Sequence, residues 1–96
     1  MRRSETQNIS EVIRQLLKEQ GLEGKLAENR LLNSWEEVLG KLASRHTQSL
    51  YIKDRVLYVS LRSSVVRNEI MMIRDELIKR LNEKAGREII DKIVIR

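Results

Sequence analysis

Two tyrosines and three basic residues are the best candidates for a binding surface in this chain. Tyr51 and Tyr58 lie in two segments whose apolar residues alternate, with Lys53, Arg55 and Arg62 close by. Aromatic rings stack on unpaired bases and basic side chains approach phosphates, so this group is typical of a nucleic-acid interface. A cross-strand tyrosine pair also stabilises an ordinary sheet, and the sequence leaves both interpretations open.

A second candidate surface follows a predicted long helix. Arg67, Arg74 and Lys84 fall near one angular position of that helix, with Met71 and Ile78 beside them. Such a strip can receive a partner helix or follow a phosphate backbone. Alternatively, Met71 and Ile78 pack under the N-terminal helix while the arginines stay solvated.

The first seven residues form a predicted flexible basic arm ahead of a single domain over residues 8–96. Arg2 and Arg3 would add affinity for nucleic acid without adding specificity. The alternative is that these two residues only improve solubility.

Residues suited to catalysis or metal binding are scarce. The chain has no cysteine, which excludes a disulfide, a thiolate zinc site and a cysteine nucleophile, and His46 is the sole histidine. No phosphate-binding Walker loop or dinucleotide fingerprint is present. Gly21 and Gly24 have the spacing of a nucleic-acid-binding GXXG loop, but the intervening leucine and glutamate favour an ordinary helix end. We expect no enzyme, no cofactor and no metal.

Composition agrees with one small domain that has an acidic partner. The 96 residues include no proline and only four glycines, and the net charge is +5. No apolar run approaches the roughly 20 residues needed to cross a bilayer, so we expect a cytoplasmic protein without a membrane contact. The oligomeric state is left open.

Hydrophobic periodicity places these residues on helices and strands. A first helix starts at Asn8, with Glu11 completing a capping box, and stops at Gly21. A second helical region follows, divided near Asn33 if Ser34 and Glu37 form another capping box. Two strands are predicted over 49–53 and 57–62, a helix from Ser63 or Ser64 to Gly86, and a last strand marked by Ile89, Ile93 and Ile95.

The register of the predicted hairpin depends on its turn. A two-residue turn at Asp54 and Arg55 pairs Tyr51 with Tyr58 on one face and puts the aliphatic residues of both strands on the other. A longer loop is the alternative, because Asp-Arg is not the favoured Asp-Gly turn.

The predicted fold is α+β with the order α-α-β-β-α-β. A right-handed crossover through the long helix places the last strand parallel to the second strand of a three-stranded sheet, with the helices on one face. Val66, Ile70, Ile73, Leu77 and Leu81 form the predicted core stripe of that helix.

Several short motifs occur together in an order that resembles a known family, the DciA-like proteins, long catalogued as a bacterial domain of unknown function. The motifs are Trp35 to Gly40, Ala43 to Thr47, Leu57 to Leu61, Ser63-Ser64, Arg80 to Asn82 and Ile93 to Arg96. The resemblance implies a KH-like domain of bacterial DNA replication that binds DNA, single-stranded or at a fork, and contacts the replicative helicase DnaB as a loader or operator. The alternatives are an RNA-binding KH-like protein and a protein-only adaptor for an acidic partner.

Overall fold

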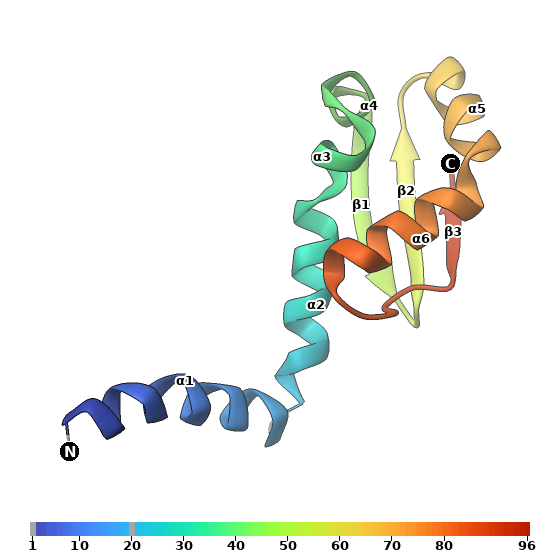
Figure 1. Ribbon diagram of the computed structural model, residues 1–96. Helices are drawn as coiled ribbons and strands as arrows, with labels where there is room; N and C mark the ends of the chain where they lie inside the picture. Colours follow the sequence, from blue (N-terminus) through green and yellow to red (C-terminus); the bar gives the residue numbers. More distant parts are fainter. Residues whose placement is uncertain (1, 20) are drawn as a thin grey trace.

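The computed structural model is an α+β body with one helix projecting from it (Figure 1). It describes the backbone of residues 2–19 and 21–96 and, within the first helix, the side chains of residues 9–16 and 18. The elements in chain order are α1 (Arg2–Glu19), α2 (Leu22–Asn33), α3 (Trp35–Leu39), α4 (Lys41–Arg45), β1 (Thr47–Lys53), β2 (Val56–Leu61), α5 (Ser64–Met72), α6 (Arg74–Ala85) and β3 (Lys92–Ile95).

The three strands form one sheet in the order β1-β2-β3. β1 and β2 are antiparallel, and β2 and β3 are parallel. In Figure 1 the connection through α5 and α6 passes in front of the sheet and returns beyond β2, which is the predicted right-handed crossover. The predicted α+β class, element order and sheet are therefore confirmed, with both long helical regions subdivided.

The hairpin register is the predicted one. Ile52 pairs with Leu57, Leu50 with Val59, and Tyr51 with Tyr58. Asp54 and Arg55 have φ values of 52° and 66°. Positive φ at both central residues defines the type I′ turn that suits a twisted hairpin, so the two-residue loop is confirmed although neither residue is glycine.

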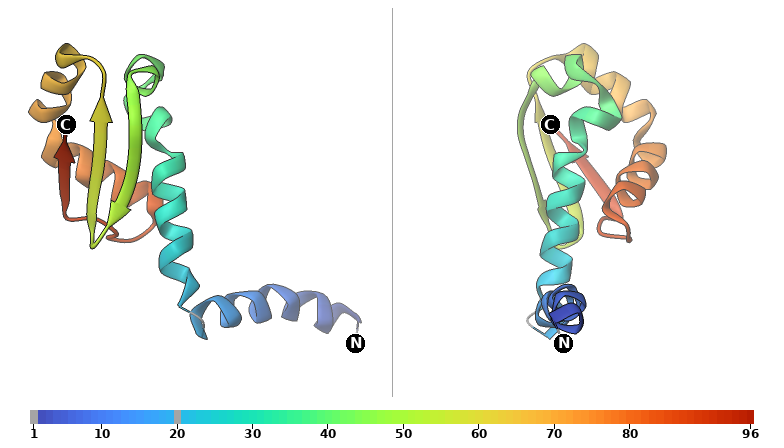
Figure 2. Two further views of the ribbon diagram at one scale, coloured as in Figure 1. Left: turned by 180° about the vertical axis from the view of Figure 1, so that it is seen from behind. Right: turned by 60° about the vertical axis from the view of Figure 1, so that its left-hand side comes forward.

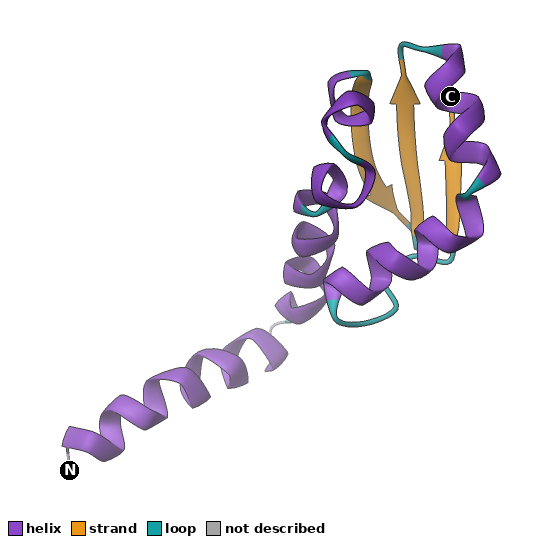
Figure 3. Ribbon diagram, turned by 45° about the horizontal axis from the view of Figure 1, so that its top comes forward, coloured by secondary structure: helices purple, strands orange, loops and turns teal. Residues whose placement is uncertain are grey.

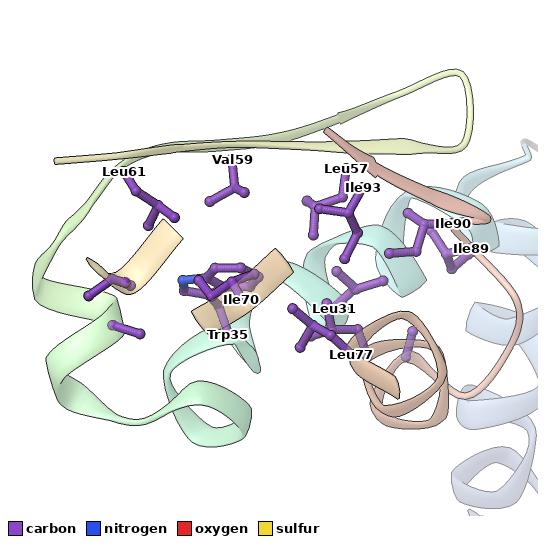
Figure 4. Close-up of a cluster of buried hydrophobic side chains, with 14 of the residues drawn as sticks. Leu31, Trp35, Leu57, Val59, Leu61, Ile70, Leu77, Ile89, Ile90 and Ile93 are labelled. Atoms are coloured by element: carbon purple, nitrogen blue, oxygen red, sulfur yellow. The ribbon is translucent and has the colours of Figure 1, made fainter. Parts of the chain in front are cut away.

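The core lies between the sheet and the helices on a single face. Leu57, Val59 and Leu61 of β2 and Ile93 of β3 are buried there. Figure 4 shows them beneath the sheet, facing side chains of the helices, and the views in Figures 2 and 3 show the helices gathered on that side and along the β1 edge. None of the described helices lies on the opposite face of the sheet (Figures 2 and 3).

The predicted long helix is wrong as a single element, because it breaks at Ile73. That residue was expected in the core stripe but is 46% exposed, whereas Val66, Ile70, Leu77 and Leu81 are buried. A straight helix over residues 64–85 would be roughly 33 Å long, and six-residue β2 spans only about 20 Å. The break lets α5 cover the end of β2 while α6 turns across the sheet.

Two predicted capping boxes are also wrong. α1 begins at Arg2, so Asn8 lies inside the helix rather than at its start. The Ser34 hydroxyl donates to the Leu31 carbonyl at 2.7 Å instead of capping α3. The cap at Ser63 is confirmed, because its hydroxyl accepts from the Val66 amide at 3.2 Å.

Asn82 fixes the segment that leads from α6 into β3. Its Nδ2 donates to the Ile90 carbonyl, and its Oδ1 accepts from the Ile89 and Ile90 amides at 2.9 and 3.1 Å. Ile89 was predicted in the last strand, but it lies before β3 and is buried with Ile90. Arg30 of α2 donates twice to the Ala85 carbonyl, which satisfies the C-terminus of α6.

The sole tryptophan joins the helices to the first strand. Trp35 is 3% exposed, and its Nε1 donates to the Thr47 hydroxyl at 2.9 Å; that hydroxyl donates to the Ala43 carbonyl at 2.8 Å. The expectation that Trp35 lies in the core with a partner for its indole N–H is confirmed.

We predict that Thr47→Val lowers the free energy of unfolding by about 1–3 kcal/mol, because the replacement keeps the shape but removes the partner of a buried indole N–H. Urea denaturation followed by tryptophan fluorescence measures the change. Ser49→Ala, an exposed change on the same strand, is expected to stay within about 0.5 kcal/mol. Equal effects of the two changes would contradict this role of Thr47.

The turn gives a second prediction, in which a glycine variant is more stable than an alanine variant, the reverse of their usual order. Arg55→Gly should be more stable than Arg55→Ala by about 1 kcal/mol, because both lose the arginine contacts and only glycine adopts positive φ without strain. Denaturant midpoints of the two variants test this. An alanine variant as stable as the glycine variant would show that the turn stores no such strain.

Candidate nucleic-acid interface

The uncovered face of the sheet carries charged side chains of one sign only. Its side chains come from alternate positions on each strand, since the intervening residues enter the core. They are Ser49, Tyr51 and Lys53 of β1, Val56, Tyr58 and Ser60 of β2, and Lys92, Val94 and Arg96 along β3 and its end. We call these nine residues the open face. Three of them are basic and none is acidic.

Two stacked tyrosines occupy the middle of the open face. The Tyr51 and Tyr58 ring centroids are 4.9 Å apart and the rings are inclined by 13°. Tyr51 is 44% exposed, whereas Tyr58 is half-buried. The Arg96 guanidinium carbon lies 5.3 Å from the centre of the Tyr58 ring, within cation–π range. Side chains from β1, from β2 and from the residue that follows β3 therefore form one row.

The charges of the open face are not neutralised by neighbouring carboxylates. Among the residues whose side chains are described, none forms an ion pair with Lys53, Lys92 or Arg96. Lys53 and Lys92 are exposed. A solvated aromatic surface with positive charge around it can accept a base on its rings and phosphates at its rim.

Two arginines predicted to bind nucleic acid, Arg55 and Arg62, lie outside the open face and make contacts within the fold. Arg55 donates to Asp91 Oδ2 at 3.3 Å and to the Glu88 carbonyl at 3.1 Å. Arg62 donates to the Arg45 carbonyl at 3.0 Å. Both side chains remain partly accessible at the two ends of the hairpin, but their hydrogen bonds hold neighbouring segments together.

The basic strip predicted along the long helix is divided by the break at Ile73. Arg67 lies on α5, where it donates to the Leu61 carbonyl at 3.2 Å. Arg74 and Lys84 lie on α6, and Lys84 pairs with Glu37 of α3. The prediction that these three residues share one face is wrong, because the helix breaks at Ile73 and because, at 100° per residue, Lys84 lies about 100° from Arg67 even on an unbroken helix.

The apolar members of that strip also separate. Met71 is 49% exposed, and Ile78 is partly buried against the core. The interpretation that both pack under the N-terminal helix is wrong, since α1 projects away from α5 and α6 (Figures 1 and 2). Met71 lies instead in an exposed group with Met72 and Ile73, which are 83% and 46% exposed. We call these three residues the α5–α6 knuckle.

Other predicted residues have limited roles in the described structure. Gly21 has φ of 69° between α1 and α2, and Gly24 lies inside α2, so the pair forms a helix boundary rather than an open GXXG loop. The side chains of Arg2 and Arg3 lie outside the described residues. No cluster of three potential metal ligands occurs among the described residues, and none of the described helices is long and apolar enough to cross a membrane.

The sequence-based prediction of the interface missed Lys92 and Arg96. Their place depends on β3 pairing with β2, which puts Val94 beside Tyr58. The signal was present, because inward-facing Ile93 and Ile95 require their neighbours to point outward.

Comparisons with known proteins agree with the family resemblance that the sequence motifs indicated. The chain is 24% identical over 89 residues to a protein of Corynebacterium glutamicum (strain R) named "UPF0232 protein". The match covers 93% of this chain and 50% of the relative, so the chain spans about half the length of that curated relative. The family model described as "Dna[CI] antecedent, DciA" matches residues 8–95. Because that match extends over nearly the whole chain, the protein belongs to the DciA family.

Proposed function

We propose that this protein is a non-enzymatic accessory factor of DNA replication that binds single-stranded DNA on the open face and contacts the replicative helicase. The observation that carries the DNA part is the stacked tyrosine pair, which lies in a solvated row with Arg96, beside two lysines that form no ion pair with the described side chains. Membership of a family named as an antecedent of two Dna proteins supports the replication part.

Single strands fit the open face better than duplex DNA. The rings of Tyr51 and Tyr58 lie nearly parallel, and Tyr51 is accessible. A ring surface of this kind stacks on a base only when that base is not paired and stacked within a duplex. Single strands and forks offer such bases. Lys53 and Lys92 lie on opposite outer strands and would contact the phosphates on either side of the stacked base.

The contact with the helicase is proposed for the α5–α6 knuckle. Methionine side chains adapt to different partner surfaces, and those of Met71 and Met72 are already exposed. Arg74 adjoins them and is exposed, so the knuckle suits a partner with apolar and acidic side chains. This site replaces the predicted pair of Met71 and Ile78, since Ile78 packs against the core.

For DNA binding, we predict that Tyr51→Ala weakens the affinity for a fluorescent oligothymidylate by roughly 5- to 100-fold, the usual contribution of one stacked base. Fluorescence anisotropy at near-physiological salt measures this. Tyr51→Phe is the matched control, because it keeps the ring and loses only the hydroxyl, and it should bind as the wild type does.

The same assay is repeated at different salt concentrations and with RNA in place of DNA. Lys53→Ala should reduce the slope of log affinity against log salt by about one, as expected for a lost phosphate contact. An oligouridylate of the same length tests the RNA alternative. If neither strand binds detectably, the DNA proposal fails and the protein-only adaptor is favoured.

For the helicase, we predict that Met72→Glu reduces the amount of purified replicative helicase retained on the immobilised protein after nuclease treatment by at least about tenfold. A buried charge at an interface without a partner costs several kcal/mol, and Met72 is exposed enough for the fold to tolerate the change. Lys79→Glu, an exposed change on α6, is the control for added negative charge. Equal retention by the Met72 variant and the wild type would remove the knuckle from the proposal.

A further inference from the structure

The helix α1 carries an apolar stripe that the rest of the described chain leaves uncovered. Ile9, Val12, Ile13 and Leu16 are 47–59% exposed. At 100° per residue they fall within about 100° of arc, which is the width of a face that normally packs against another element. We call these four residues the α1 stripe. Figures 1 and 2 show α1 extending away from the body, and the molecule is 59 Å long but only 25 and 21 Å across.

An exposed helix of this kind needs a covering surface. Helices in proteins derive most of their stability from packing of an apolar face, and isolated helices are marginal in water. α1 has 18 residues and packs against α2 only near their junction. We propose that a second copy of this chain covers the α1 stripe, so that two α1 helices pair in an antiparallel dimer.

The α1 stripe is complementary to itself under a two-fold axis. In an antiparallel pair centred between Val12 and Ile13, Ile9 of one copy faces Leu16 of the other, and Val12 faces Ile13. Each contact then occurs twice, as a closed two-fold dimer requires. The positions have the spacing of a short helix–helix seam and hold only branched aliphatic side chains.

Charge also favours self-association at this stripe. Glu11, Arg14 and Lys18 point to the opposite side of α1, and Arg14 pairs with Glu11 of its own helix at 2.9 Å. No described charge therefore faces its like across the seam. Among residues 9–16 and 18, no basic side chain lies beside the stripe, as a contact with nucleic acid would need, and no aromatic residue joins it, as is usual at membrane surfaces.

The antiparallel direction keeps the two basic bodies apart. Each chain carries a net charge of +5. Parallel helices would bring both bodies to the same end of the pair, whereas antiparallel helices centred between Val12 and Ile13 place the two C-terminal ends of α1 roughly 20 Å apart along the axis. That separation is more than twice the Debye length of about 8 Å at physiological salt, so their repulsion is largely screened.

The exposed area fits a weak, reversible dimer. The four stripe residues expose roughly 400 Å² per chain, and with their polar flanks two copies would bury about 1,000 Å², an area typical of weak, transient interfaces rather than of stable ones. An interface of that size is expected to be weak and transient, and its affinity depends on packing quality more than on area. The proposal is independent of the proposed function, because the α1 stripe is separate from both the open face and the knuckle.

Sedimentation equilibrium of the full chain from about 1 to 500 μM tests the dimer, with a mass twice the 11.3 kDa of one chain expected at the upper end. We expect Val12→Lys to raise the dissociation constant at least about tenfold. Glu11→Lys is the control: it places the same side chain one residue away, on the opposite face, and adds more positive charge, yet it should leave the constant within about twofold.

The direction of pairing has its own measurement. Because the chain lacks cysteine, a single spin label at Lys25→Cys reports one distance across the dimer, near the junction of α1 and α2. We expect more than about 20 Å for antiparallel helices, whose junctions with α2 lie roughly 20–25 Å apart along the axis, and a shorter distance would overturn that arrangement.

Three outcomes would overturn the dimer itself. The wild-type chain can stay monomeric throughout the range, or it can form a dimer that Val12→Lys leaves intact. It can also stay monomeric and bind anionic phospholipid vesicles or the helicase through Val12, which would assign the α1 stripe to that other occupant.

Discussion

The contacts of Arg55 at the hairpin turn set the register on which both faces of the sheet depend. Asp54 and Arg55 adopt positive φ without glycine, which costs energy for each residue. Arg55 offsets that cost by binding Asp91 and the Glu88 carbonyl, while the Asp91 amide donates to the Arg55 carbonyl at 2.9 Å. A register shifted by one residue would place Tyr51 and Tyr58 in the core and the aliphatic residues in water.

The same contacts join the hairpin to the segment that becomes β3. Asp91 immediately precedes β3, and Asn82 holds Ile89 and Ile90 just before it. The turn and the asparagine therefore fix the start of β3 from two sides. Lys92 and Arg96 reach the open face only because of this pairing, so the charge of the candidate interface depends on residues that touch no ligand.

Short-range patterns in the sequence predicted the sheet well, because a strand's alternation directly reports which face is buried. The turn length then determined the pairing of Tyr51 with Tyr58. The break at Ile73 was not predictable in this way, since apolar residues continue at helical spacing through it. The break is imposed by the short sheet that α5 and α6 must cover together. The open face was predicted only in part for the same reason: Tyr51, Tyr58 and Lys53 are local to the hairpin, whereas Arg96 arrives through a long-range pairing.

Sequence periodicity also shows that α1 has an apolar face without showing what covers it. The structure separates that face from the open face, and distant surfaces without shared contacts act additively. A dimer through α1 would nevertheless couple two open faces through effective concentration, because the second face binds a strand already held by the first. Weak stacking on one tyrosine pair and weak pairing of one short helix would then combine into a contact with DNA that neither surface achieves alone. The gain would require a strand long enough to reach both open faces, so a short oligonucleotide would report only the affinity of a single face.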